Sequence, residues 1–312
     1  MKKASEKLKI IKLSAWVAII SNFLLSLLKV FASFASGSAA LLADGIDSAC
    51  DVLISLVTLV VARIMSKPAD TDHPWGHGRA ETVATVLLSF ILFFVGGQLI
   101  VSGITSLIRG NNLLVPSTIA IVVTVFSIFV KGALSAIHFI LGKKVGSSIL
   151  KATAKNFAGD VLISIGVLIG LIASDLTSSG VADVLVQMII GVWIIKTAVG
   201  IFLEANTELM DGSHNQEPYW ALMKAVEKTK GASNPHRIRM RKIAGFWDID
   251  CDIEVDPNLT VSKAHNIASK VEENIKKELS NVYDIVVHIE PHGDDAHEGF
   301  GVSAKNIKKR KK

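Results

Sequence analysis

Long apolar stretches separated by short polar loops make up most of the chain up to residue 204. A helix that crosses the hydrocarbon core of a bilayer needs about 20 predominantly apolar residues. Six stretches are long enough, and each predicts one membrane-spanning helix: 13–36, 39–65, 83–107, 116–141, 151–174 and 181–204. The basic start runs into the first stretch without a small-residue cleavage site, so we expect no cleavable signal peptide. The pattern predicts a multi-pass α-helical membrane protein.

After residue 205 the pattern changes to the shorter rhythm of a small soluble domain. We expect a helix, two strands, a helix and a strand, over 217–229, 235–243, 245–256, 262–278 and 283–290. A tight turn at Ala244–Gly245 joins the first two strands, and Ser262 is placed to cap the second helix. This order predicts an α+β domain in which a helix pair covers a three-stranded sheet.

The predicted elements divide the chain into four segments. These are an N-terminus over 1–12, a six-helix membrane domain over 13–205, a soluble domain over 206–292, and a basic tail over 293–312. The tail is rich in Gly, Asp, Lys and Arg, and we expect it to be disordered.

Composition and charge add an orientation. Half of the residues are hydrophobic and the mean hydropathy is +0.46, which excludes an ordinary soluble enzyme. Lysine and arginine gather in the N-terminus and in the loops 63–79 and 142–155, whereas Arg109 is the single basic residue of the opposite loops. Basic loops stay in the cytoplasm, so both termini are expected there. This bias and the tail account for the net charge of +5, so no nucleic-acid partner is needed.

Acidic residues occur inside two of the apolar stretches. Asp47 and Asp51 are four residues apart, and Asn156 and Asp160 repeat this spacing. Each pair lies on one face of its helix, so two facing helices would offer four oxygen ligands. A charged side chain at mid-bilayer costs about 2.5–3.5 kcal/mol, so several carboxylates indicate a bound cation. We predict a divalent-cation site here, and we interpret Asp44 as a helix cap or vestibule residue.

A polar loop follows the second stretch and contains Asp70, Asp72, His73 and His77. Imidazole and carboxylate groups suit zinc and neighbouring transition metals. A short loop of this kind can equally be a solvated loop without a metal, and the spacing does not decide between the two.

Polar residues are also scattered through the soluble domain, namely His236, Asp252, His265, His288 and Glu290. His288 and Glu290 alternate on one predicted strand and therefore point the same way. They could bind a metal together with Asp252 from a neighbouring strand, or form an ordinary polar strand face.

Three lysines fall inside predicted spans, namely Lys29, Lys131 and Lys196. We expect each to reach the membrane interface or to line an aqueous cavity, with no role as a ligand.

Nearly the whole chain resembles the cation diffusion facilitator family of metal exporters. The resemblance is carried by the six spans, the two intramembrane pairs, the His-Pro-Trp-Gly-His-Gly-Arg-Ala-Glu stretch over 73–81, and the Val-Val-His-Ile-Glu-Pro end of the soluble domain. It implies a ferredoxin-like soluble domain and a homodimer in a bacterial or archaeal cell membrane. It further implies exchange of cytosolic Zn²⁺, Mn²⁺ or Fe²⁺ for protons by alternating access.

The resemblance also assigns residues to sites. The transport site is Asp47, Asp51, Asn156 and Asp160, and the loop site is Asp70, His73 and His77. A metal-sensing and dimerisation site maps to His236, Asp252, His288 and Glu290, with His265 nearby. Arg79 and Asp211 match a charge pair between the loop and the membrane–soluble junction.

Two positions depart from the zinc-exporting members of this family. Histidine is usual where this chain has Asn156, and it is common where Asp252 stands. Both changes replace nitrogen by hard oxygen, which favours manganese or iron(II) and leaves the metal open. A passive metal channel and an intramembrane aspartyl protease remain alternatives. A channel builds rings from several subunits, whereas one asymmetric cage in each chain suits a carrier. The protease would have its two aspartates on separate helices and would have no use for a His-rich loop.

Overall fold

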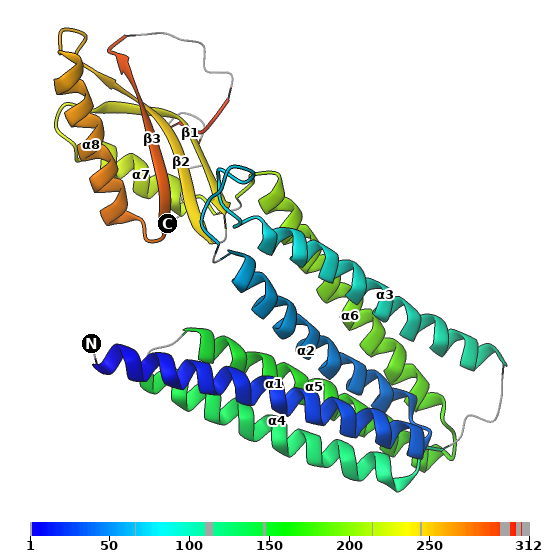
Figure 1. Ribbon diagram of the computed structural model, residues 1–312. Helices are drawn as coiled ribbons and strands as arrows, with labels where there is room; N and C mark the ends of the chain where they lie inside the picture. Colours follow the sequence, from blue (N-terminus) through cyan, green and yellow to red (C-terminus); the bar gives the residue numbers. More distant parts are fainter. Residues whose placement is uncertain are drawn as a thin grey trace. The chain divides into compact units, whose positions relative to one another are not determined.

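The computed structural model describes residues 2–65, 67–109, 115–145, 148–213, 215–243, 245–293, 300–303 and 307. Six long helices come first: α1 (Lys2–Ser36), α2 (Ala39–Met65), α3 (Ala80–Arg109), α4 (Thr118–Val145), α5 (Ser148–Thr177) and α6 (Val181–Leu209). Each contains a segment long and apolar enough to cross a membrane, which confirms the six predicted spans (Figure 1).

The described chain forms two compact units. One comprises residues 1–63 and 84–202 and contains most of the six long helices. The other comprises residues 64–83 and 203–312, so the polar loop between α2 and α3 belongs with the C-terminal domain.

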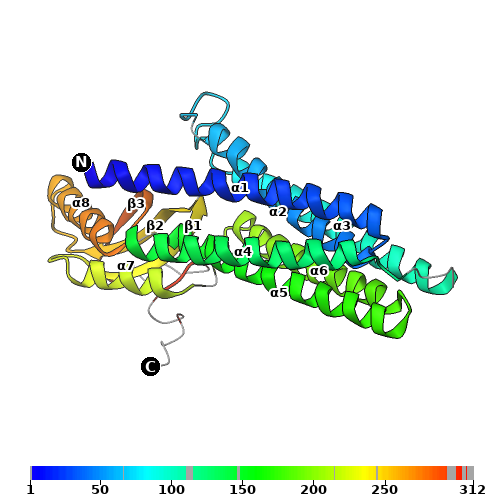
Figure 2. The ribbon, with the colours of Figure 1, turned by 90° about the horizontal axis from the view of Figure 1, so that it is seen from below.

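Within the helical unit, α1, α4 and α5 pack side by side (Figure 1, Figure 2). Helices α3 and α6 approach closely through two glycines. A Cβ atom added at Gly96 would lie 2.7 Å from the carbonyl oxygen of Gly191, and one added at Gly191 would lie 2.9 Å from that of Gly96. Glycine pairs let backbones of membrane helices come this near, so these two positions fix the α3–α6 crossing.

The start of α2 is capped by a residue from α6. Asp183 accepts hydrogen bonds from the backbone N–H groups of Ala39 (2.5 Å) and Ala40 (3.3 Å), and from Ser38 Oγ (2.7 Å). These are donors that a helix N-terminus leaves unpaired, and a carboxylate also suits the positive end of the helix dipole. Asp183 therefore anchors the helix that carries Asp47 and Asp51.

The C-terminal domain contains α7 (Glu217–Glu227), β1 (Ser233–Ile243), β2 (Phe246–Val255), α8 (Val261–Glu278) and β3 (Val282–Pro291). The sheet order is β1-β2-β3, with β1 antiparallel and β3 parallel to the central strand. Apolar residues of α7, α8 and the sheet form one buried core, including Leu222, Ile253 and Val271. The predicted α+β domain, a helix pair on a three-stranded sheet, is confirmed.

Two local predictions need correction or comment. Thr260, rather than Ser262, caps α8, because its side-chain oxygen accepts the backbone N–H of Lys263 at 3.4 Å. The turn between β1 and β2 uses Gly245 at φ +78°, a left-handed conformation that glycine adopts without strain. Ala244 lies outside the described residues.

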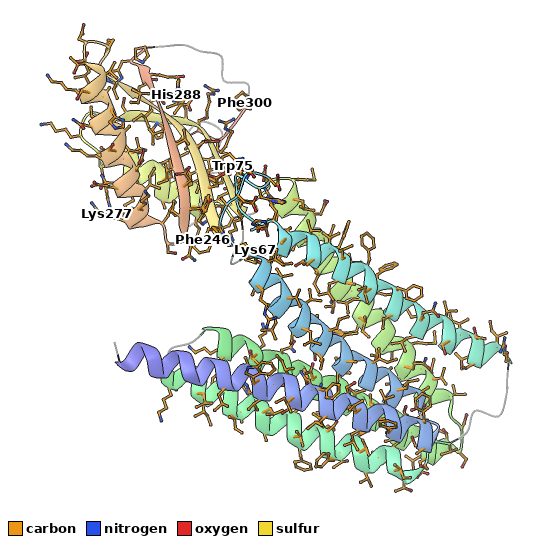
Figure 3. The ribbon with its side chains drawn as sticks, in the orientation of Figure 1. Lys67, Trp75, Phe246, Lys277, His288 and Phe300 are labelled. Carbon is orange, nitrogen blue, oxygen red and sulfur yellow. The ribbon has the colours of Figure 1, made fainter. Side chains whose placement is uncertain are left out.

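Part of the segment that we expected to be disordered lies against β1. Val302 and Ile238 exchange two backbone hydrogen bonds (2.9 and 3.0 Å), and Ile307 is buried in the domain core. Phe300 lies under the guanidinium groups of Arg237 and Arg239 (Figure 3). Three apolar side chains in a basic segment thus find a partner at the open edge of the sheet. The remaining tail, 294–299, 304–306 and 308–312, lies outside the described residues.

Candidate metal sites

The intramembrane pairs lie on two helices that face one cavity. Asp47 and Asp51 project from α2, and Asn156 and Asp160 project from α5. All four line the same cavity of about 390 Å³, together with apolar residues of α3 and α6.

The cavity holds an oxygen-rich set of potential ligands. It offers three carboxylates and one amide oxygen, a set that suits hard divalent cations. Asp51 Oδ2 is buried and has no hydrogen-bond partner among the described residues. A buried carboxylate oxygen without a partner is costly, and a bound cation would satisfy it. The residues present therefore fit a divalent cation as cargo.

Sequence reasoning missed the partners of the intramembrane acids. Lys131 Nζ lies 2.9 Å from Asp160 Oδ2, and Lys29 Nζ lies 2.7 Å from Asp44 Oδ2. Both lysine side chains are fully buried, so the expectation that they reach an interface or a cavity is wrong. Of the three lysines, Lys196 alone is exposed, with its ammonium 5.7 Å from the ring centre of Trp193.

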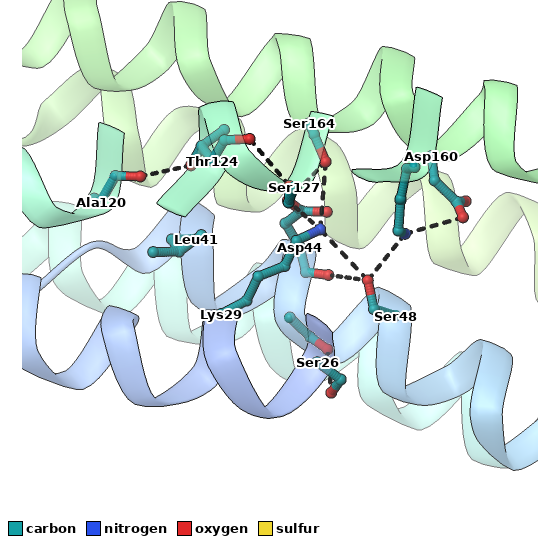
Figure 4. Close-up of polar contacts among 12 residues, drawn as sticks. Ser26, Lys29, Leu41, Asp44, Ser48, Ala120, Thr124, Ser127, Asp160 and Ser164 are labelled. Carbon is teal, nitrogen blue, oxygen red and sulfur yellow. Dashed lines mark hydrogen bonds and ion pairs between the residues drawn. The ribbon is translucent and has the colours of Figure 1, made fainter. Parts of the chain in front are cut away.

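Asp44 is also placed differently from our interpretation. Its carboxylate is fully buried, pairs with Lys29 and accepts a hydrogen bond from Ser164 Oγ at 2.9 Å (Figure 4). Asp44 is therefore neither a cap nor a vestibule residue. A usable signal was present, because two basic residues and an extra acid inside spans imply buried ion pairs.

The loop between α2 and α3 brings its three predicted ligands together. Ligand atoms of Asp70, His73 and His77 all lie within 4.8 Å of one another. The backbone N–H of His73 donates to Asp70 Oδ1 at 2.7 Å, and Gly76 makes the turn at φ +74°. That hydrogen bond lowers the pKa of the Asp70 carboxyl. His77 Nε2 is 3.6 Å from Asp70 Oδ2, while its buried Nδ1 has no hydrogen-bond partner among the described residues.

Charged residues hold this loop within the C-terminal unit. Arg79 pairs with Asp211 and also donates to the Glu208 carbonyl at 2.8 Å. On the other side of Asp211, the guanidinium of Arg241 lies 3.6 Å away and 5.2 Å from the ring centre of Trp75. The Arg79–Asp211 pair expected from the family resemblance is present in the structure, and Arg241 and Trp75 extend it to β1.

The cytoplasmic domain brings together one ligand from each strand. His236 on β1, Asp252 on β2 and Glu290 on β3 are all buried, and their ligand atoms lie within 4.8 Å of one another. His236 Nδ1 contacts the Asn234 carbonyl oxygen at 2.7 Å, and Nε2 lies 2.9 Å from Glu290 Oε2. With Nδ1 donating its proton to the carbonyl, neutral His236 would present Nε2 to a metal.

The two remaining predicted residues of this domain lie outside that cluster. The side chain of His288 is 63% exposed, although its Nε2 is 3.7 Å from Glu290 Oε1 (Figure 3). His265 is exposed on α8, and no contact among the described residues joins it to the cluster. Sequence reasoning missed Arg237, whose Nη1 donates to Asp252 Oδ2 at 2.7 Å and lies 3.8 Å from Glu290 Oε1.

Comparisons with known proteins cover both parts of the chain. The cation efflux transmembrane domain matches residues 15–210, and the cation efflux protein cytoplasmic domain matches residues 215–292. The chain is 34% identical to the uncharacterized transporter YdbO of Bacillus subtilis (strain 168), over 92% of this chain and 98% of that protein. It is 33% identical to the manganese efflux system protein MneS of the same organism, over 89% and 94% of the two chains. The solved metal-bound C-terminal domain of the CzcD transporter from Thermotoga maritima covers 25% of this chain and 92% of its own, with 30% identity and a TM-score of 0.25.

The protein is therefore an integral membrane transporter of cations. It belongs to the cation diffusion facilitator family, as the motifs around the intramembrane pairs and the loop predict. Members of this family move metal ions and are not enzymes, which excludes the aspartyl protease alternative.

Proposed function

We propose that the protein exports divalent transition-metal ions from the cytoplasm in exchange for protons. The observation that carries this proposal is the membrane cavity into which α2 and α5 place three carboxylates and one amide. One asymmetric cage in each chain suits a carrier that exposes its site alternately to the two sides. A passive channel instead builds rings of equivalent groups from several subunits.

Manganese is the metal that the ligand set favours. The proposed site contains oxygen donors alone, because Asn156 supplies an amide where zinc exporters of this type have an imidazole. Hard oxygen ligands suit Mn²⁺ better than they suit Zn²⁺. The 33% identity to a manganese efflux system protein supports the same choice, with Fe²⁺ as the next candidate.

Proton exchange would use the same carboxylates. A carboxylate must be deprotonated to bind a metal, so metal and protons compete for Asp47, Asp51 and Asp160. Asn156 carries no titratable proton, so the exchanged protons would come chiefly from these three residues.

The loop and cytoplasmic sets would serve as additional metal sites. We infer that the His236, Asp252 and Glu290 cluster senses cytosolic metal, and that two cytoplasmic domains associate in a homodimer. The match to the cytoplasmic domain of cation efflux proteins supports this assignment. Both termini would lie in the cytoplasm, because the basic loops are on that side.

Flux into sealed vesicles tests the proposal. The purified protein should move Mn²⁺ across the vesicle membrane when a pH gradient drives protons in the opposite direction. Asp51→Asn should abolish this flux. Asp175→Asn is the matched control, because it neutralises an exposed carboxylate on α5 that lies outside the cavity. Parent-like flux in Asp51→Asn would refute the transport site. Flux that ignores the pH gradient would refute proton exchange and favour a channel.

A further inference from the structure

Two buried lysine ammonium groups lie inside the helical unit, next to the intramembrane carboxylates. Lys131 on α4 and Lys29 on α1 meet at Ser48, whose Oγ is 3.0 Å from Lys131 Nζ and 3.4 Å from Lys29 Nζ (Figure 4). Lys131 also pairs with Asp160, whereas Lys29 pairs with Asp44.

The two pairs differ in what the carboxylate does. Asp44 does not line the cavity, and it satisfies Lys29 together with Ser164, which lies 3.3 Å from Lys29 Nζ. Asp160 does line the cavity and belongs to the proposed transport site. The ammonium of Lys131 is therefore a cation already bound to a carboxylate that the cargo requires.

By Coulomb's law, a bound metal ion and the Lys131 ammonium compete for the carboxylate of Asp160. A divalent ion bound to Asp160 would stand close to a positive charge 2.9 Å from the same carboxylate, in a region of low dielectric constant. The ion and the ammonium therefore repel one another, and the carboxylate attracts both. Metal binding is favoured only if the ammonium moves away, or if the attraction between the metal and the carboxylates exceeds the repulsion between the metal and the ammonium.

The structure also provides a place for the ammonium to go. Ser48 Oγ is already within hydrogen-bond distance of Lys131 Nζ. Beyond Ser48, the Oδ1 atom of Asp44 is buried and accepts no hydrogen bond from any described residue. Movement of the ammonium to this oxygen would exchange one carboxylate partner for another without leaving the ammonium unpaired.

We propose that Lys131 is the resident cation of the transport site, which neutralises Asp160 when no metal is bound and is displaced toward Asp44 by the metal. The proposal rests on the proposed function, since it assumes that Asp160 binds the cargo. Lys131 is a positioning residue in this scheme. It lowers metal affinity, and by returning to Asp160 it promotes metal release.

Neutral replacements of Lys131 test this role. Lys131→Met and Lys131→Gln both remove the charge, and glutamine keeps a hydrogen-bonding group for Ser48 and Asp160. In vesicles at fixed pH, both should lower the Mn²⁺ concentration for half-maximal flux by about tenfold and should lower maximal flux, because release slows. Lys131→Arg keeps the charge and should restore both values toward those of the parent. Lys196→Met is the matched control, since it removes an exposed membrane lysine outside the described ion pairs.

Direct binding provides a readout that is independent of transport. Equilibrium dialysis of ⁵⁴Mn²⁺ would use a background with Asp70→Ala and Asp252→Ala, which disables the loop and cytoplasmic sets. Lys131→Gln should bind Mn²⁺ about tenfold more tightly than this background. Parent-like or weaker binding in a folded Lys131→Gln protein would overturn the inference. If Asp51→Asn and Asp160→Asn also bound like the background, the proposed transport site itself would fail. If one of the two neutral variants does not fold, the other decides, because Lys131→Met and Lys131→Gln both remove the charge.

Discussion

In both the membrane cavity and the cytoplasmic cluster, a basic side chain of the protein pairs with a carboxylate. The two basic side chains differ in their exposure to solvent. Lys131, which holds Asp160, is 0% exposed, whereas Arg237, which holds Asp252 and approaches Glu290, is 30% exposed. The ammonium is enclosed by helices, while the partly exposed guanidinium lies over the ring of Phe300, 4.8 Å from its centre.

The two regions also differ in how closely their ligands converge. The cytoplasmic ligand atoms lie within 4.8 Å of one another because three hydrogen-bonded strands carry them: Asp252 is opposite His236, and Glu290 is two residues beyond the β3 partner of Asp252. The carboxylates of the membrane site line one cavity, but among the described residues they do not form so close a set. A rigid cluster suits a site that reports metal concentration. A wider one, built on two separate helices, suits a site that must bind and release its cargo in every cycle.

The largest expected effect separates the two regions by their role in transport. Asp160→Asn removes a charged group of the proposed transport site and should lower Mn²⁺ flux by about 30-fold or more, since such a loss typically costs about 2–5 kcal/mol. Asp252→Asn should leave maximal flux within about threefold of the parent, because it acts through regulation alone. Vesicle flux at saturating Mn²⁺ measures both variants. Equal losses would show that the cytoplasmic cluster is part of the transport path.

The second prediction concerns selectivity, which belongs to the membrane site alone. Asn156→His adds a nitrogen ligand and should shift the preference toward Zn²⁺, because Zn²⁺ readily accepts tetrahedral sets that include nitrogen. Asn156→Asp adds a negative charge and should tighten Mn²⁺ binding while slowing turnover. Competition flux with Zn²⁺ and Mn²⁺ checks both. An unchanged metal ranking and rate in both variants would mean that Asn156 is not a ligand.

The third prediction tests the difference between the two tethered cations. An ion pair that reaches solvent contributes about 1 kcal/mol or less, so Arg237→Ala should raise cytoplasmic metal affinity by at most about fivefold. This effect is smaller than that expected for Lys131, which is fully buried. Binding would be measured on full-length protein carrying Asp70→Ala and Asp160→Asn. A tenfold or larger gain would contradict the assignment of Arg237 as a weak competitor.

The smallest expected effect is the pH response of the loop. The backbone N–H of His73 lowers the pKa of Asp70, so this carboxyl stays ionised at pH values where an ordinary aspartate begins to protonate. Its contribution to metal binding is present above that lowered pKa and is lost only in stronger acid. Between pH 8 and 6 we therefore expect no loss of metal affinity from protonation of Asp70.

Asp70→Asn tests this in protein that carries Asp160→Asn and Asp252→Ala. It should weaken Mn²⁺ binding by a similar factor at pH 6 and pH 8, because the Asp70 carboxyl is ionised at both. A pH dependence that disappears in Asp70→Asn would show that the Asp70 carboxyl itself titrates in this range.

The fold was largely predictable because its signals are local. Span length and the four-residue spacing of the acids depend on the helix repeat alone, so the sequence placed Asp47 with Asp51 and Asn156 with Asp160. The strand order of the soluble domain likewise follows from short apolar runs and turn residues. Such signals also placed His73 and His77 on one short loop with Asp70.

Which residues form the ion pairs depended on helix packing. The depth of Lys29 and Asp44 in the membrane could nevertheless be predicted from the sequence. Lys29 precedes Gly37 by eight residues and Asp44 follows it by seven, so two helices joined there place both charges at one depth. Depth does not decide how each helix is rotated, or which of several neighbours it meets. That is why the sequence did not show that Lys131 faces Asp160.

The sequence by itself determined that this is a six-helix membrane protein with a C-terminal α+β domain, and it named the acids and histidines that we propose as ligands. Only the tertiary structure decided which of them converge and which cations already hold them. It brought His236, Asp252 and Glu290 together and left His265 apart. In the tertiary structure, Asp183 caps α2 and part of the tail pairs with β1. The physical reason is that helix and strand periodicity act over a few residues, whereas ion pairing and edge contacts depend on side chains brought together from distant segments.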